Sequence, residues 1–115
     1  MNWYLTKLVF NIEIEKSKSS SQFDEQLRMI SATSQEEAFF KARAVGKREE
    51  VEFQNAQQKK IAWRFIDVCE VQLIEALNDG VEIYSSTHET DEANNYIRFI
   101  KQKASLIQTQ NLVFI

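Results

Sequence analysis

The sequence is poor in the residues that many catalytic and metal sites require. Its 115 residues include no proline, two glycines, one histidine and one cysteine. Two isolated glycines, Gly46 and Gly80, cannot build a phosphate-binding loop or a dinucleotide fingerprint. His88 alone cannot form a multi-histidine metal site, and Cys69 alone excludes an intrachain disulfide and a cysteine-based zinc site. We therefore expect no metal and no cofactor.

Long apolar runs and an excess of basic charge are also absent. No uninterrupted apolar run approaches the roughly 18–20 residues of a membrane span, and the N-terminal segment lacks the basic start and apolar core of a signal peptide. A net charge of −3 argues against non-specific binding to nucleic acid, which needs a concentrated basic surface. The sequence therefore predicts a cytoplasmic protein that contacts neither a membrane nor nucleic acid.

Apolar residues make up 43% of the chain, and aromatic residues 11%, which is enough to form a real core. The length suits one domain and is too short for two ordinary ones. We therefore expect residues 1–115 to form a single domain.

Alternating apolar and polar residues predict four strands. The first strand runs from Trp3 to Glu15, and the second from Gln22 to Thr33. The polar stretch Lys16–Ser21 between them is predicted to be a flexible hairpin connection. Lys60–Ile74 and Val81–Thr87 are the third and fourth predicted strands. A turn is expected between these two, at Asn78-Asp79-Gly80.

Two helices are predicted from capping residues and helical spacing. Ser34 followed by Glu37 forms a capping box, and the helix that it opens is expected to continue through Gly46 to about Asn55. Alternatively, Gly46 ends one helix before a second turn begins. Asp91 is expected to cap a final helix. The apolar tail Leu112–Ile115 is expected to dock on the core, to add an edge strand or to pack on another subunit.

The order of elements is therefore strand, strand, helix, strand, strand, helix. Hairpins separated by helices indicate an α+β domain with a mainly antiparallel four-stranded sheet and helices packed on one face.

Five short motifs occur in a fixed order along the chain. They are Trp3-Tyr4-x-x-Lys7, Phe23-Asp24-Glu25-Gln26-Leu27-Arg28-x-Ile30-Ser31-Ala32, Glu36-Glu37-Ala38-Phe39-x-Lys41-Ala42-Arg43-Ala44-x-Gly46, Trp63-x-Phe65-x-x-Val68 and Asp79-Gly80-x-Glu82-Ile83-Tyr84-Ser85. This set resembles the bacterial domain of unknown function number four thousand two hundred and eighty-eight, over residues 2 to about 107. The resemblance implies a bacterial, stand-alone domain. It supplies no activity, ligand or catalytic residue.

The face of the sheet that points away from the helices is predicted to be unusually apolar. Its expected residues are Trp3, Leu5, Lys7 and Val9 on the first strand, Gln26, Arg28 and Ile30 on the second, and Arg64, Ile66, Val68 and Glu70 on the third. A sheet face exposed to water is normally more polar, and large apolar patches mark partner or ligand surfaces. Alternatively, the tail or a helix of the same chain covers this face.

These patterns favour a small binding or interaction module that forms a homodimer, or binds another protein, through its outward sheet face. The sequence does not determine whether a small molecule also binds. The candidate binding or interface residues are Trp3, Lys7, Arg28, Trp63, Arg64 and Tyr84. Trp63 and Tyr84 could instead belong to the core.

Two other functions fit the sequence less well. One is an acidic immunity-type inhibitor of a toxin, which the size and the net charge allow. The other is an enzyme that uses Glu25 or Asp67 with Arg28, which would require these side chains to converge in a pocket. The simpler interpretation of the two acids is that each is paired with a lysine or arginine. Cys69 is expected to be a buried, inert thiol.

Overall fold

The computed structural model describes residues 1–15 and 21–112, and side chains as far as residue 109. The chain divides into two compact units, Met1–Tyr84 and Ser85–Ile115, and each is described by itself. The predicted connection Lys16–Ser21 and the predicted tail Leu112–Ile115 lie outside the described residues, apart from Ser21 and Leu112. The interpretation of the whole chain as one domain stays a prediction.

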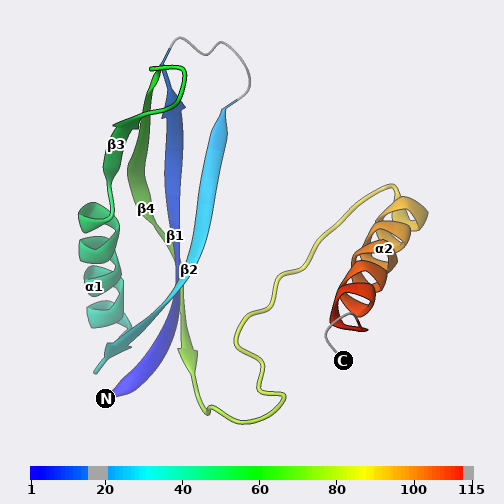
Figure 1. The fold of residues 1–115 in the computed structure, drawn as a ribbon. Coiled ribbons are helices and arrows are strands. Elements are labelled where there is room, and N and C mark those ends of the chain that lie inside the picture. The colour runs from blue at the N-terminus through cyan, green and yellow to red at the C-terminus, as the bar shows by residue number, and fades with distance from the viewer. Residues whose placement is uncertain (16–20, 113–115) are drawn as a thin grey trace. The chain divides into compact units, whose positions relative to one another are not determined.

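The first unit contains a four-stranded antiparallel sheet in the order β2-β1-β4-β3 (Figure 1). Its strands are β1 (Asn2–Ile14), β2 (Gln22–Ala32), β3 (Val51–Gln54) and β4 (Lys60–Ile74). Helix α1 (Gln35–Arg48) lies along one face of this sheet. The predicted α+β class and the four-stranded antiparallel sheet are confirmed, although two of the elements differ from those expected.

Helix α1 begins at the predicted cap. The Ser34 hydroxyl accepts a hydrogen bond from the Glu37 N–H at 3.1 Å. The Glu37 carboxylate accepts from the Thr33 hydroxyl at 2.9 Å and from the Thr33 N–H at 3.2 Å, one residue earlier than in a standard capping box. These bonds, the hydroxyl bond first, hold the pKa of Glu37 below its ordinary value.

Helix α1 ends at Arg48, so the prediction that it extends to about Asn55 is wrong. Val51–Gln54 instead forms β3, which pairs with the start of β4. The Asn55 side chain closes the hairpin, because its carbonyl accepts from the N–H groups of Gln57 and Lys59. Pairing with β4 therefore overrides the helical propensity of this segment, which is a tertiary effect.

The predicted strand Val81–Thr87 is absent, because that segment has no regular secondary structure. The predicted turn before it is present. The Val81 N–H donates to the Asn78 carbonyl at 3.1 Å, and Gly80 takes a φ of 86°, which a side chain would disfavour. The sheet still has four strands, because β3 is present where Val81–Thr87 was expected to supply the fourth.

Two irregularities in the pairing of β1 with β4 change which residues face the core. Lys7 pairs with Glu70 and Leu8 with Val68, so Cys69 is skipped. Because β4 has one extra residue here, the side chains beyond it point to the opposite face of the sheet from the one expected. Val68 is therefore buried with Leu8, contrary to its predicted outward position, and Cys69 is exposed rather than buried as expected. A second shift, at Ile66, restores the original facing, so that Phe10 pairs with Phe65.

The core lies between α1 and the sheet face that it covers. Its buried apolar residues are Tyr4, Leu8, Phe10, Ile30, Ala32, Ala38, Ala42 and Val68. Thr6 is fully buried among them, and its hydroxyl donates to the Arg28 carbonyl at 2.9 Å. The one polar group at the centre of β1 is therefore satisfied by the backbone of the neighbouring strand.

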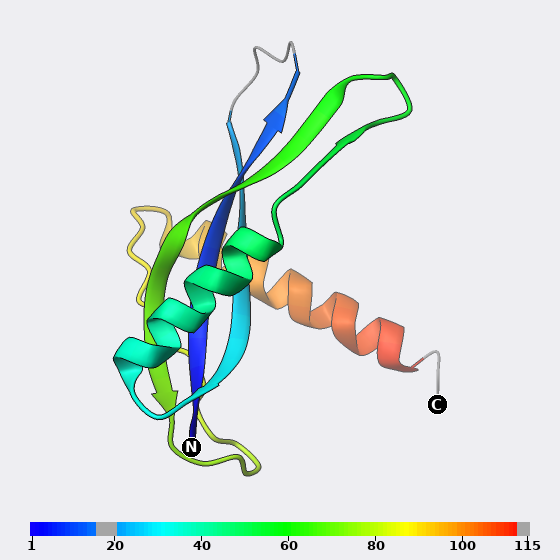
Figure 2. The same ribbon diagram turned by 90° about the vertical axis from the view of Figure 1, so that its left-hand side faces the viewer.

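Helix α1 is shorter than the strands on which it packs. Its 14 residues span about 21 Å at 1.5 Å per residue, whereas the 13 residues of β1 span about 43 Å. Figure 2 shows the strands extending well beyond one end of the helix. The part of this sheet face that lies beyond Phe10, towards Ile14 of β1, therefore extends past the end of α1.

The second unit contains α2 (Ala93–Leu112), which is the final helix that the sequence predicts. The Tyr96 N–H donates to the Glu92 carbonyl, so the helix starts just after the predicted cap, Asp91. The helix has basic residues but no acidic ones, and apolar side chains lie exposed along it: Tyr96, Ile97, Phe99, Ile100, Leu106 and Ile107. Within the first unit, α1 packs on the sheet, and packing of the second predicted helix on the same face stays a prediction.

Neither helix within residues 1–15 and 21–112 combines the length and the apolar character needed to cross a membrane.

Replacing Gly46 with alanine should destabilise the first unit. A Cβ at this position would lie 2.2–2.6 Å from the Phe65 ring. Overpacking of this kind costs about 1–3 kcal/mol, which offsets the ~1 kcal/mol that alanine gains in helix propensity. Urea denaturation should therefore show a lower free energy of unfolding for Gly46→Ala, and a partial recovery when Phe65→Leu is added. A more stable Gly46→Ala protein would contradict the close helix–sheet contact.

Candidate functional site

The six predicted site residues lie on two opposite faces of the first unit. Trp3, Lys7 and Arg64 lie on the outward face, which points away from α1, and Tyr84 contacts Lys7 there. Arg28 and Trp63 lie on the inner face, which α1 partly covers. The structure therefore does not bring the predicted set together into one site.

The error in the predicted outward face lies in how β1 and β2 are matched. Residues directly opposite in an antiparallel pair share a face. Lys7 lies opposite Leu27, and Thr6 lies opposite Arg28, so the outward face carries the odd-numbered residues of β2. Arg28 was assigned to the wrong face because alternation within each strand does not fix the register between strands.

The centre of the outward face holds a small polar cluster. Lys7 Nζ lies 2.7 Å from Glu25 Oε1 and 5.8 Å from the centre of the Tyr84 ring. The Tyr84 hydroxyl donates to Glu70 at 3.5 Å. The Glu25 hydrogen bond is the main cause that raises the pKa of Lys7 above its ordinary value, and Tyr84 also contributes. Tyr84 therefore holds the segment that follows β4 against this face.

Part of the outward face is buried within the chain. Leu5 and Ile74 are only 6% and 7% exposed. Within the first unit, the segment that returns to this face is the irregular stretch that ends at Tyr84, whose side chain contacts Lys7 and Glu70. Cover by the tail or by the second helix stays a prediction.

The outward side of β2 remains exposed. Phe23, Leu27 and Met29 are 55%, 50% and 49% exposed, and Trp3 on the neighbouring strand is 45% exposed. We call Phe23, Leu27 and Met29 the β2 strip. It is an apolar surface at the edge of the sheet, since β2 is an outermost strand.

The inner side of β2 carries a connected row of polar side chains. The Trp63 indole N–H donates to Asp24 at 3.0 Å, and the Gln26 amide donates to the same carboxylate oxygen at 2.7 Å. Arg28 donates to the Gln26 carbonyl oxygen from Nε at 3.1 Å and from Nη2 at 2.8 Å. We call Asp24, Gln26 and Arg28 the β2 ladder. It fixes the positions of both the Trp63 ring and the Arg28 guanidinium.

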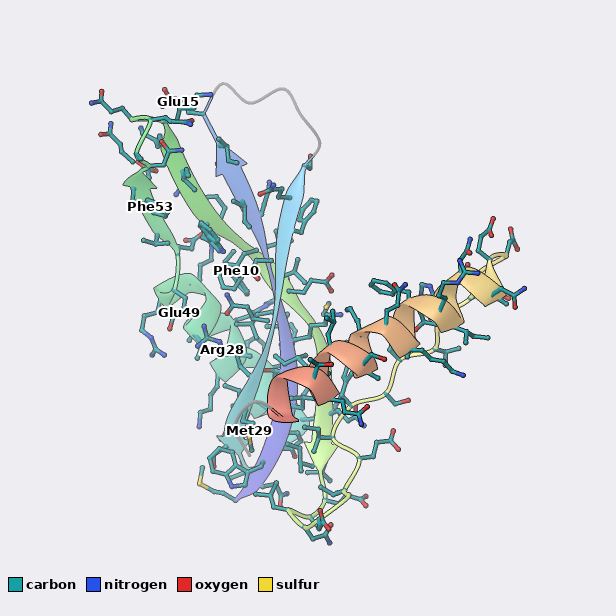
Figure 3. All side chains as sticks on the ribbon, turned by 45° about the vertical axis from the view of Figure 1, so that its right-hand side comes forward. Phe10, Glu15, Arg28, Met29, Glu49 and Phe53 are labelled. Atoms are coloured by element: carbon teal, nitrogen blue, oxygen red, sulfur yellow. The ribbon has the colours of Figure 1, made fainter. Side chains whose placement is uncertain are left out.

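A cavity of about 320 Å³ opens beside the β2 ladder, on the part of the inner face that α1 leaves uncovered. Its lining residues are Phe10, Gln26, Arg28, Glu49, Val51, Phe53 and Trp63. Figure 3 shows Arg28 and Glu49 near the end of α1, with Phe10 and Phe53 beyond them. Because α1 stops at Arg48 and β3 leads away from it, the cavity lies at the junction of helix and strand.

One wall of the cavity is aromatic and the opposite side is charged. The rings of Phe53 and Trp63 stack with their centroids 6.1 Å apart and an interplanar angle of 20°. Arg28 Nη1 lies 3.6 Å from Glu49 Oε1. Asp24, Gln26, Glu49 and Phe53 were not among the candidate site residues predicted from the sequence, and Gln26, like Arg28, was expected on the outward face. The signal that could have found Asp24 and Gln26 is the alternation of polar residues along one strand, at Asp24, Gln26 and Arg28.

The carboxylates proposed for catalysis are each held in an ion pair. Glu25 pairs with Lys7 on the outward face, while Asp67 accepts two hydrogen bonds of 2.9 Å from Arg43 of α1. Neither lines the cavity that contains Arg28. Within residues 1–15 and 21–112 there is no group of three histidine, cysteine or acidic residues that could hold a metal ion.

The first unit is a small α+β domain in which one helix crosses half of a curled, four-stranded antiparallel sheet. The chain belongs to the family described as domain of unknown function DUF4288, whose model matches residues 3–85. No curated protein and no solved structure matches the chain. The matched residues coincide with the first compact unit, so the match stops well short of residue 107, to which the resemblance was expected to extend.

The ion pair between Asp67 and Arg43 should make the free energy of unfolding depend on pH. The Arg43 hydrogen bonds, and then the Val68 N–H, hold the pKa of Asp67 below its ordinary value. The ionised form therefore stabilises the fold above the ordinary pKa, and this contribution disappears as the pH falls through the lowered native pKa. Urea denaturation from neutral pH to about pH 2 should show a weaker acid dependence for Asp67→Asn than for the wild type.

The matched control is Asp79→Asn, in the exposed turn after β4. Its acid dependence should follow that of the wild type. Equal curves for Asp67→Asn and Asp79→Asn would show that the Arg43 contact does not stabilise the fold.

Proposed function

We propose that the domain is a binding module that forms a homodimer through the β2 edge and the outward face beside it. The observation that carries this proposal is the β2 strip, three apolar side chains about half exposed on an outermost strand. Apolar patches at such positions are typical of partner surfaces.

The two edges of the sheet differ in a way that favours β2 as the interface. β2 is 11 residues long and is paired on one side only within the described residues. β3, the other edge, has four residues, and Glu52 on it contacts both Arg64 and Lys60. Short, charged edges resist pairing with other chains, whereas long apolar edges promote it.

A second copy of the chain is the partner that fits this surface. An antiparallel strand beside its own copy is self-complementary, as a twofold interface requires. Glu25 is the charged residue on the outward side of β2, and Lys7 of the same chain neutralises it at 2.7 Å. Two copies can therefore approach without leaving an unpaired like charge in the contact.

Light scattering after size-exclusion chromatography, at tens of micromolar, should give twice the 13.5 kDa chain mass for the wild type. Leu27→Lys should give the mass of a single chain, because it places a charge in the proposed contact. The matched control is Phe40→Lys on α1, where the residue is 54% exposed, against 50% for Leu27. It should remain a dimer.

Circular dichroism of both variants would check that they are folded. A wild type that is monomeric at this concentration, or a folded Leu27→Lys protein that is still dimeric, would refute the proposed interface.

The other functions predicted from the sequence have less support. The acidic inhibitor depends on a net charge of −3, and several of the acids are engaged by bases of the same chain, as in Glu25 with Lys7 and Asp67 with Arg43. The enzyme would need Glu25 or Asp67 beside Arg28, but Glu25 pairs with Lys7 and Asp67 pairs with Arg43. The inhibitor and the cytoplasmic location stay predictions.

A further inference from the structure

We propose that the cavity beside Arg28 binds a small carboxylate that carries a planar apolar group. The cavity lies on the inner face of the sheet, opposite the β2 strip. The proposal is therefore independent of the proposed dimer.

The walls of the cavity suit a flat apolar group. Phe53 and Trp63 present stacked rings, Val51 lies beside them on β3, and Phe10 forms a buried base. Val51 and Phe53 are nearly half exposed, so a ligand there would remove apolar surface from water. A volume of about 320 Å³ is at the small end of the range for ligand sites.

The β2 ladder prepares Arg28 to bind an anion. A guanidinium has five N–H donors, and those at Nε and on one side of Nη2 are held by the Gln26 carbonyl oxygen. Gln26 is in turn fixed by Asp24, which also holds the Trp63 indole. The orientation of the guanidinium is therefore set before a ligand arrives, which lowers the entropic cost of binding.

Among residues 1–15 and 21–112, the further contact of the Arg28 guanidinium is a long one to Glu49. Nη1 lies 3.6 Å from Glu49 Oε1, which is longer than a charge-assisted hydrogen bond of about 2.7–2.9 Å. Glu49 is the C-cap of α1, its side chain is 42% exposed, and the capping bonds are made by its backbone N–H. Its carboxylate can therefore turn into water when a ligand carboxylate takes its place beside Arg28.

This arrangement predicts opposite effects for two neighbouring substitutions. Arg28→Gln removes the cation and should weaken binding of a carboxylate. Glu49→Gln removes the competing carboxylate and should strengthen binding. A cationic ligand held by the aromatic rings and Glu49 would give the reverse pattern, so the two signs together identify the charge of the ligand.

The test is a titration of the full chain, labelled with ¹⁵N, with 2-naphthoate, followed by NMR. The Trp63 indole N–H signal, which the variant Trp3→Phe distinguishes from that of Trp3, should shift on binding. The uncharged 2-naphthamide should bind at least about tenfold more weakly, as should 2-naphthoate to Arg28→Gln, since hydrogen bonds to charged groups are worth this much or more. Arg48→Gln, a neighbouring exposed arginine that does not line the cavity, should bind as the wild type does.

A second variant keeps the test decisive if Arg28→Gln does not fold. Val51→Trp places a larger side chain at a half-exposed edge position, where it should fill the cavity and abolish the Trp63 shift. The proposal is overturned if millimolar 2-naphthoate leaves the Trp63 signal unchanged. It is also overturned if the amide binds equally well, if folded Arg28→Gln or folded Val51→Trp binds as the wild type does, or if Glu49→Gln binds more weakly.

Discussion

The close approach of α1 to the sheet is the contact on which the rest of the first unit depends. Ala38, Ala42 and Gly46 present a small-residue side of the helix, and the Phe65 ring occupies the space that a Cβ of Gly46 would need. Phe65 in turn packs on Phe10, with ring centroids 5.5 Å apart. A larger residue on this side would separate the layers and expose the core, because interiors are packed without spare volume.

The same contact explains why a cavity exists. A 14-residue helix held against strands about twice its length covers only half of the face. Beyond its end the chain becomes β3, and Phe53 stacks on Trp63 rather than being covered by a further turn of helix. The polar β2 ladder is tolerated on this half of the inner face because its members satisfy one another and because Gln26 and Arg28 line the open cavity.

Acidic and basic side chains neutralise one another on both faces of the sheet, so the two faces differ mainly in their apolar surfaces. Lys7 meets Glu25 on the outward face, and Arg43 of α1 meets Asp67 of β4. Exposed pairs of this kind contribute modestly to stability. Their larger consequence is that the β2 strip carries no net charge of its own. The proposed dimer and the proposed ligand site both rest on apolar surfaces, the first on the outward face and the second beside Arg28.

Local information in the sequence was sufficient for β1, β2, β4 and the start of α1. Strand alternation repeats every two residues, and the Ser34 cap involves neighbours a few residues apart, so both can be recognised without knowing the fold. The end of α1, the strand β3, the burial of Val68 and the side of the sheet on which Arg28 lies depend on how β4 pairs with distant strands. Register is a non-local property, and a shift of one residue moves a side chain to the opposite face. Only the tertiary structure therefore decided which residues form the candidate site.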